Sequence, residues 1–168
     1  MLCKKIILMG LFCLCLIGCG WRPVYYQFDK NTEQTSMVEI APVSNEDGRL
    51  LIQKLKDILN PQNEQVEKKY TLKIELSEHL NTEQGIIGDS TSTRATMRMS
   101  AQFKLIDKAK EAVLIDESTF AESSYNILTL PYPTVMADEA TRKRLLDVVA
   151  EQIGTRIAVF FAENKHEN

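Results

Sequence analysis

The chain has 168 residues and a formal net charge of −3, with 20 basic and 23 acidic side chains. This acidic balance argues against general binding to nucleic acid, which requires a basic surface. The length suits one domain with a sizeable core, because a domain of about 150 residues buries roughly 68–70% of the surface that its unfolded chain exposes.

The first 18 residues have the pattern of a secretion signal. Lys4 and Lys5 supply positive charge, and residues 6–17 form an apolar run. The run is shorter than the roughly 20 residues that cross a bilayer, but it fits the core of a signal peptide. We therefore expect residues 1–18 to be removed, which leaves 18 basic and 23 acidic residues in the mature chain.

The apolar run ends in Leu16-Ile17-Gly18-Cys19, a pattern called a lipobox. In this chemistry a diacylglycerol alkylates the cysteine thiol, a peptidase cuts before the cysteine, and the new amino terminus is acylated. A cut without lipid would need an A-x-A-like site, and none is present. The alternative is that Cys19 is one more apolar cysteine, like the three before it. Because Cys19 lies where the sequence turns polar, we interpret it as the lipidation site.

The first elements of the mature chain are short. Residues 19–36 are polar and weakly periodic, so we predict a lipidated tether. Residues 37–43 alternate weakly and contain a proline near their end, which suits an edge strand. Asn45 or Asp47 can cap the helix that follows, and Asn60-Pro61 stops it. Four residues at helical spacing form its apolar face: Leu51, Leu55, Ile58 and Leu59.

Three longer strands follow. Residues 70–77 alternate between apolar and polar side chains, and so do residues 95–105, the clearest strand of the chain. The polar stretch 81–92, which contains two glycines, predicts the loop between them, and residues 107–111 predict a turn. Residues 113–121 form the return strand, whose facing the pattern leaves open.

An irregular connection at 125–133 leads into a long helix. It runs from near Thr134 to about Ala162, on the order of 40 Å at 1.5 Å per residue. One apolar face per strand implies an α+β fold, with two helices on one face of a roughly four-stranded antiparallel or mixed sheet. We place the domain at 37–163 and a disordered tail at 164–168. The long helix has a predicted buried stripe of Leu145, Val148, Val149, Ile153, Ile157 and Phe160.

The other face of the sheet is polar and includes four cations. They follow the alternation of two strands: Lys73, Arg94, Arg98 and Lys104. Cations separated by hydroxyls bind phosphate or carboxylate groups, and arginine does so with two parallel hydrogen bonds. The alternative is a solvated face balanced by Glu75, and composition alone favours it.

Catalysis is not indicated. His166 lies in a charged tail, and His79 lies at a strand end without a cysteine partner, so a surface role outweighs a general base. Glu75 and Glu78 fall on opposite faces of one strand and form no acid pair. Phosphate loops, metal-ligand clusters and G-x-S-x-G turns are missing, so we expect no enzyme activity, metal or cofactor. The basic run Arg142-Lys143-Arg144 is interpreted as a charged solvent face.

The start of the mature chain reads Cys19-Gly20-Trp21-Arg22-Pro23-Val24-Tyr25. It resembles the start of the lipopolysaccharide-assembly lipoproteins called LptE in their alphaproteobacterial form, which commonly read C-G-[FW]-[RQ]-P-[LV]-Y. The similarity continues through Ser124-Tyr125-Asn126, Pro131-Tyr132 and Met136-Ala137-Asp138-Glu139-Ala140. It extends over nearly the whole mature chain. Each motif is short, so their order and spacing carry the resemblance.

This resemblance implies a fold like the one predicted and a role without catalysis. LptE lies largely inside the β-barrel of LptD, in a 1:1 complex, at the outer membrane. It plugs the barrel, helps the barrel assemble and assists insertion of lipopolysaccharide into the outer leaflet. The implied partners are therefore LptD, lipopolysaccharide and, through lipid on Cys19, the membrane. The polar sheet face and its cations would contact the barrel lumen or lipopolysaccharide phosphates.

Two other functional classes stay open. One is a lipoprotein on the periplasmic side that binds another ligand or a cell-wall polymer, which a deep apolar pocket would favour. The other is a hydrolase, which needs a nucleophile and a base near His79. A shallow, polar and exposed sheet face favours the plug.

Overall fold

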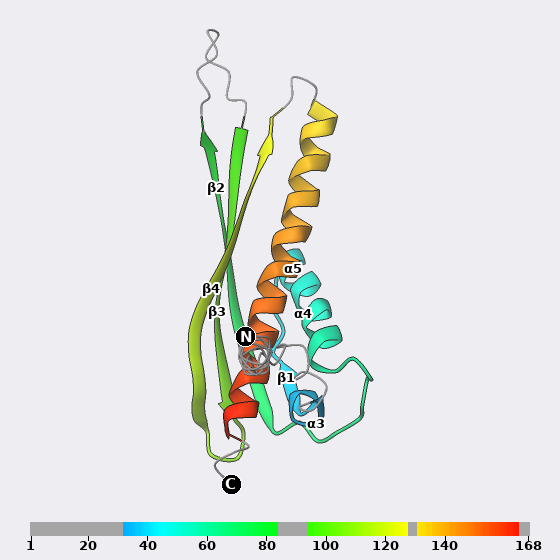
Figure 1. Cartoon of the computed structure of the whole chain (residues 1–168), viewed down its shortest axis with the longest axis vertical. Coiled ribbons are helices and arrows are strands. Elements are labelled where there is room, and N and C mark those ends of the chain that lie inside the picture. Colours follow the sequence, from blue (N-terminus) through cyan, green and yellow to red (C-terminus); the bar gives the residue numbers. More distant parts are fainter. Residues whose placement is uncertain (1–31, 84–93, 128–130, 165–168) are drawn as a thin grey trace, which may run out of the picture.

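The computed structural model describes residues 32–83, 94–127 and 131–164. The predicted signal peptide, Cys19 and His166 lie outside these ranges. Figure 1 shows three long strands beside one long helix, with the shorter elements gathered along part of their length. In chain order, the elements are α3 (Thr32–Ser36), β1 (Val38–Ile40), α4 (Glu46–Leu59), β2 (Tyr70–Glu83), β3 (Arg94–Asp107), β4 (Ala112–Asn126) and α5 (Pro131–Asn164).

The sheet is mixed, and its strands lie in the order β1-β2-β3-β4. β1 pairs with β2 in parallel, whereas β2 with β3 and β3 with β4 are antiparallel. β1 is the short edge strand predicted near residue 40. Figure 1 shows α4 and α5 on the same side of the sheet, so the predicted α+β class is confirmed.

The core lies between the sheet and the two main helices. Alternation along β3 sends every second side chain into this layer, and α4 adds three leucines one turn apart. Burying one such side chain contributes about 1.5–3 kcal/mol. The largest fully buried side chains include Leu51, Leu55, Leu59, Leu72, Met97, Met99, Phe103, Leu105, Leu146, Val149, Ile153 and Ile157.

The bounds of α4 follow the sequence signals. Asn45 is the N-cap, and its side-chain oxygen accepts a hydrogen bond from the Gly48 N–H at 2.7 Å. Asn60 is the C-cap. α4 approaches α5 closely at Gly154, where a Cβ would lie 2.5 Å from Cγ2 of Ile58. A residue without a side chain is therefore needed for the helices to pack at this distance.

Several elements are longer than predicted. α5 begins at Pro131 and not near Thr134, because the first turn of a helix tolerates prolines, whose missing N–H has no partner there. β4 continues to Asn126, into the stretch expected to be irregular, and β2 continues to Glu83. α3 lies within the last residues of the expected tether, at Thr32–Ser36.

The predicted buried stripe of α5 is wrong at Val148, which is 36% exposed. Leu146, Ala150 and Phe161 are buried although the predicted stripe omits them. The difference arises because α5 packs against the sheet on one side and against α4 on another. The buried surface of α5 is therefore wider than a single stripe. Within the described residues, no helix is long and apolar enough to span a membrane.

Candidate functional site

The strand register places the four predicted cations together on the outer face of the sheet, opposite the helices. Lys73 of β2 lies directly across from Lys104 of β3. Arg98 lies between His79 of β2 and Glu122 of β4. Arg94 shares the same alternation at the start of β3, opposite Asn126. The face is thus a polar surface crossing three strands.

Acidic residues of β4 neutralise part of this outer face. Nζ of Lys104 lies 2.9 Å from Oδ2 of Asp116. The Gln102 amide donates to the other Asp116 oxygen at 3.3 Å. The hydrogen bonds from Lys104 and Gln102 lower the pKa of Asp116. Lys73 makes no ion pair with the described part of the chain. The charge balance thus comes from β4 more than from Glu75, the residue expected to supply it.

Arg98 has a different environment from the lysines. Its guanidinium carbon lies 3.8 Å from the ring centroid of Phe120, and its Nη1 lies 3.9 Å from Glu122. Phe120 is 52% exposed, although it lies on the polar face. Sequence reasoning missed Phe120, because the facing of its strand was left open.

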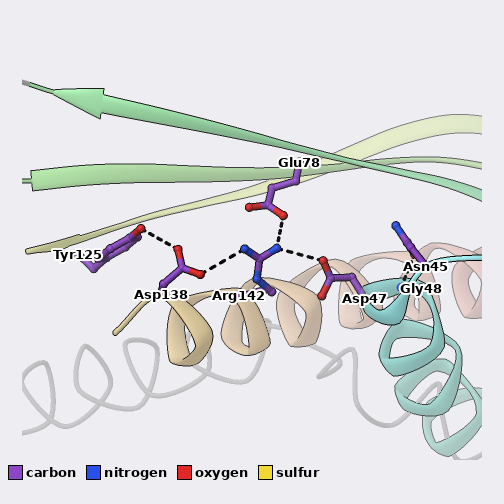
Figure 2. Close-up of polar contacts among 7 residues, drawn as sticks. All are labelled: Asn45, Asp47, Gly48, Glu78, Tyr125, Asp138 and Arg142. Carbon is purple, nitrogen blue, oxygen red and sulfur yellow. Dashed lines mark hydrogen bonds and ion pairs between the residues drawn. The ribbon is translucent and has the colours of Figure 1, made fainter. Parts of the chain in front are cut away.

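A second polar cluster, the Arg142 cluster, lies on the inner side of the sheet (Figure 2). Nη1 of Arg142 contacts Glu78 of β2 and lies 3.1 Å from Oδ2 of Asp47 at the start of α4. Nη2 lies 3.2 Å from Oδ2 of Asp138, one turn earlier in α5. Tyr125 of β4 donates to Oδ1 of Asp138 at 2.7 Å. One guanidinium thus joins α5 to α4 and β2, and Asp138 extends the link to β4.

Partial burial and hydrogen bonding shift the pKa values of two groups in the Arg142 cluster. Burial disfavours the charged guanidinium, but hydrogen bonds to Glu78, Asp138 and Asp47 outweigh it and raise the pKa of Arg142. Burial, together with the hydrogen bond to Asp138, raises the pKa of Tyr125 to about 12. Both groups therefore keep one protonation state across the physiological range, and the cluster acts as a fixed clamp.

The structure corrects the interpretation of the basic run in α5. Lys143 and Arg144 are exposed as predicted, but Arg142 is only partly exposed and faces the sheet. Two sequence signals pointed to this outcome. Asp138 precedes Arg142 by four residues, the spacing of a helical ion pair. Glu78 continues the inward alternation of β2, so its carboxylate needs a partner inside.

β4 also turns polar side chains toward α5. The guanidinium of Arg156 donates to Glu117 through Nε at 2.9 Å and Nη2 at 2.8 Å, which lowers the pKa of Glu117. Thr119 donates to the side chain of Gln152. A register shift between Leu105 and Ile106 accompanies this pairing of β3 with β4. These inward polar residues explain why the sequence left the facing of β4 open.

The chemistry available in the described residues is binding chemistry. Within residues 32–83, 94–127 and 131–164, no group of three or more histidine, cysteine or acidic side chains is arranged to hold a metal ion. His79 is exposed beside Arg98. A cavity of about 910 Å³ lies beside β1, and its lining mixes apolar residues with charged ones such as Glu39, Lys56 and Asp57. It is not the deep apolar pocket expected of a binding lipoprotein.

Comparison with known proteins supplies the relatives of this fold. A lipoprotein-assigned protein of Caulobacter crescentus has a TM-score of 0.62 at 22% identity, over 80% of this chain and 97% of its own. Rare lipoprotein B of Shewanella oneidensis has a TM-score of 0.59 at 15% identity, over 77% and 97%. A minor lipoprotein of Acinetobacter baumannii has a TM-score of 0.55 at 19% identity, over 73% and 88%. The chain has the fold of these lipoproteins.

A sequence relative covers nearly the whole chain. The "Uncharacterized protein RP188" of Rickettsia prowazekii is 26% identical over 152 residues, which are 90% of this chain and 94% of that protein. No family model matches the chain. The solved structures therefore support the predicted fold, and the sequence relative adds a match along most of the chain.

Proposed function

We propose that this protein is a lipid-anchored, non-catalytic component of the outer membrane that plugs and helps assemble the LptD β-barrel and assists insertion of lipopolysaccharide. The observation that carries the proposal is the one-sided sheet, with both main helices on one face and a broad polar surface on the other. An antiparallel sheet commonly packs one face on the core and leaves the other face to solvent. The proposal gives that second, polar face a partner.

Two features support the lipid anchor. The sequence before Cys19 ends in a lipobox, and the three solved structures compared above are of proteins described as lipoproteins. Multiple acyl chains, at about 0.8 kcal/mol per buried CH₂, make such an anchor effectively permanent. The body is thereby held at the membrane surface, where a barrel partner would meet it.

Three features of the body support a plug. The outer face alternates cations, carboxylates, hydroxyls and amides, a composition suited to a water-filled lumen. The Arg142 cluster and the pair Glu117–Arg156 fix the long helix to the sheet, so the body keeps its shape while it is enclosed. The lining of the cavity beside β1 mixes charged with apolar residues, which disfavours the alternative of an apolar-ligand carrier.

Affinity purification of the lipidated protein in mild detergent tests the proposal. We expect one large outer-membrane β-barrel protein to co-purify in equal amount. We also expect depletion of the lipoprotein to reduce lipopolysaccharide at the cell surface. A signal-sequence variant, Cys15→Ala, keeps Cys19 and should co-purify with the same barrel protein. If no barrel protein is captured and surface lipopolysaccharide is unchanged on depletion, the proposed function is wrong.

A further inference from the structure

The outer edge of β1 opens onto a cavity. Along a strand, the backbone groups of successive residues point to opposite edges. The Met37 carbonyl accepts a hydrogen bond from the Tyr70 N–H at 3.3 Å, and the Ala41 N–H donates to a carbonyl of β2 at 2.8 Å. The N–H and C=O groups of Val38 and Ile40 therefore point to the other edge. β1 is the first strand of the sheet, and no described strand lies beyond it.

This edge borders the cavity of about 910 Å³, whose other walls are the end of α4 and the stretch 60–68. The volume lies in the upper part of the range of ligand sites, about 300–1,000 Å³, so it accommodates several side chains. Leu59 and Val66 make part of the lining apolar, and acidic residues and lysines contribute nearly balanced charge. Such a lining suits a neutral occupant whose apolar side chains have polar tips, as tyrosine does.

A segment of this chemistry precedes α3 in the chain, outside the described residues. It reads Val24-Tyr25-Tyr26-Gln27-Phe28. Valine, tyrosine and phenylalanine are all enriched in β-strands. In an extended conformation, Val24, Tyr26 and Phe28 share one face, and Tyr25 and Gln27 share the other. The segment thus has the pattern of a strand with one apolar face.

We propose that residues 24–28 add to the outer edge of β1 as an antiparallel strand and fill the cavity. The length of the connection sets the direction. Residues 29–37, which include the single turn of α3, join the segment to β1. These nine residues are fewer than the dozen or so that a parallel crossover requires. An antiparallel return needs no such crossover.

The apolar alternation sets the register of this added strand. Val38 is buried on the inner face of β1, and Glu39 is exposed on the outer face. Phe28 opposite Val38 keeps the apolar face inward, with Tyr26 beside it, and Gln27 then lies opposite Glu39 outside. A slip of one residue would turn the apolar face toward solvent.

The added strand shortens the tether between the lipid and the body. Residues 20–31 could reach about 43 Å from Cys19 when fully extended, whereas residues 20–23 alone reach at most about 14 Å. The β1 end of the body is therefore held close to the membrane surface. Trp21 lies within the shortened link, at the level of the headgroups, where an amphipathic ring is favoured.

Disulfide trapping in the lipidated protein tests this pairing. The lipid occupies the Cys19 thiol and the other three cysteines leave with the signal peptide, so two introduced cysteines report alone. Gln27→Cys with Glu39→Cys places the thiols directly opposite each other, within reach of a disulfide. Phe28→Cys with Glu39→Cys is the matched control, because it places them on opposite faces. We expect the first pair to react at least about 10-fold faster within one chain.

Non-reducing electrophoresis and mass spectrometry separate the outcomes. A fast disulfide within one chain, seen only in the first pair, supports the proposal. Equal rates in both pairs would show a tether that does not pair with β1. A disulfide between two chains would show that a second copy occupies the cavity, and no disulfide in either pair would leave residues 24–28 away from β1. Each of these three results overturns the proposal.

Hydrogen exchange followed by NMR tests the backbone pairing without cysteines. The amides of Val38 and Ile40 should exchange slowly when the added strand covers them. Tyr26→Pro removes an N–H that faces β1 and should speed their exchange at least about 10-fold. Gln27→Pro removes an N–H that faces solvent, which an edge strand tolerates, and should not. Equal exchange in the two variants contradicts the pairing. Neither measurement involves the barrel, so failure here is distinguishable from failure of the proposed function.

Discussion

Arg142 of α5 contacts Glu78 of β2, although 64 residues separate them in the chain. The contact lies between the sheet and the long helix (Figure 2). The same guanidinium reaches Asp47 at the start of α4. Three elements that are remote in sequence are therefore fixed by one side chain, and that side chain should matter to stability more than its neighbours in the same basic run.

Replacing Arg142 with methionine should lower the free energy of unfolding by about 2 kcal/mol, because three partly buried carboxylates lose their common partner. Urea unfolding followed by circular dichroism measures this loss. Arg144→Met is the matched control, because Arg144 is exposed two residues away, and its effect should stay within about 0.5 kcal/mol. Equal losses in both variants would show that the Arg142 cluster contributes nothing specific.

Tyr125 should titrate unusually late. Its folded-state pKa of about 12 exceeds the ordinary value of 10.0 because of burial and the hydrogen bond to Asp138. The stability that this shift supplies is therefore complete below pH 10 and is lost as the pH rises toward 12. NMR of ring-labelled tyrosine follows the titration directly. Asp138→Asn should lower the Tyr125 pKa part of the way, since burial persists; an ordinary pKa in the native protein contradicts the contact.

Gly154 should not tolerate alanine while Ile58 is present. The added Cβ would meet Cγ2 of Ile58 at 2.5 Å, and such overpacking costs about 1–3 kcal/mol, against a helix-propensity gain of about 1 kcal/mol. We expect a net loss of about 1 kcal/mol in the free energy of unfolding. In an Ile58→Ala background, Gly154→Ala should become neutral or stabilising. Additive effects in this cycle would exclude close packing of α4 on α5 at this point.

Cys19→Ala, made behind a signal peptide that is cleaved at an A-x-A site, should abolish acylation and release the body from membranes of cells that lack the proposed barrel partner. Labelled palmitate incorporation and membrane fractionation measure the two effects. Cys15→Ala replaces a cysteine inside the apolar run of residues 6–17 and should change neither. Palmitate on a Cys19→Ala chain would show that the lipobox interpretation is wrong.

Strong local patterns made much of the fold predictable. The alternation of β3 and the leucine spacing of α4 each have one apolar face and one polar face, so period alone identifies them. α5 and β4 were harder. α5 packs against two neighbours, and β4 turns Glu117 and Thr119 inward toward Arg156 and Gln152, so neither shows a clean stripe.

The sites divide in the same way. Alternation placed Lys73, Arg98 and Lys104 on one face, because register in a two-sided sheet follows directly from period. The partners of these residues could not be predicted, since they come from β4, whose facing was ambiguous. The Arg142 cluster depends on how α5 lies across the sheet, a tertiary relationship that no local pattern encodes.

Site-specific photocrosslinking in living cells tests the central claim most directly. A photoreactive amino acid at Gln102 probes the outer sheet face, and one at Val148 probes the exposed side of α5. A plug is enclosed on all sides, so both positions should crosslink to the same large outer-membrane β-barrel protein. Crosslinks from both positions to other partners, or to none, while the protein remains in the outer membrane, would contradict a plug.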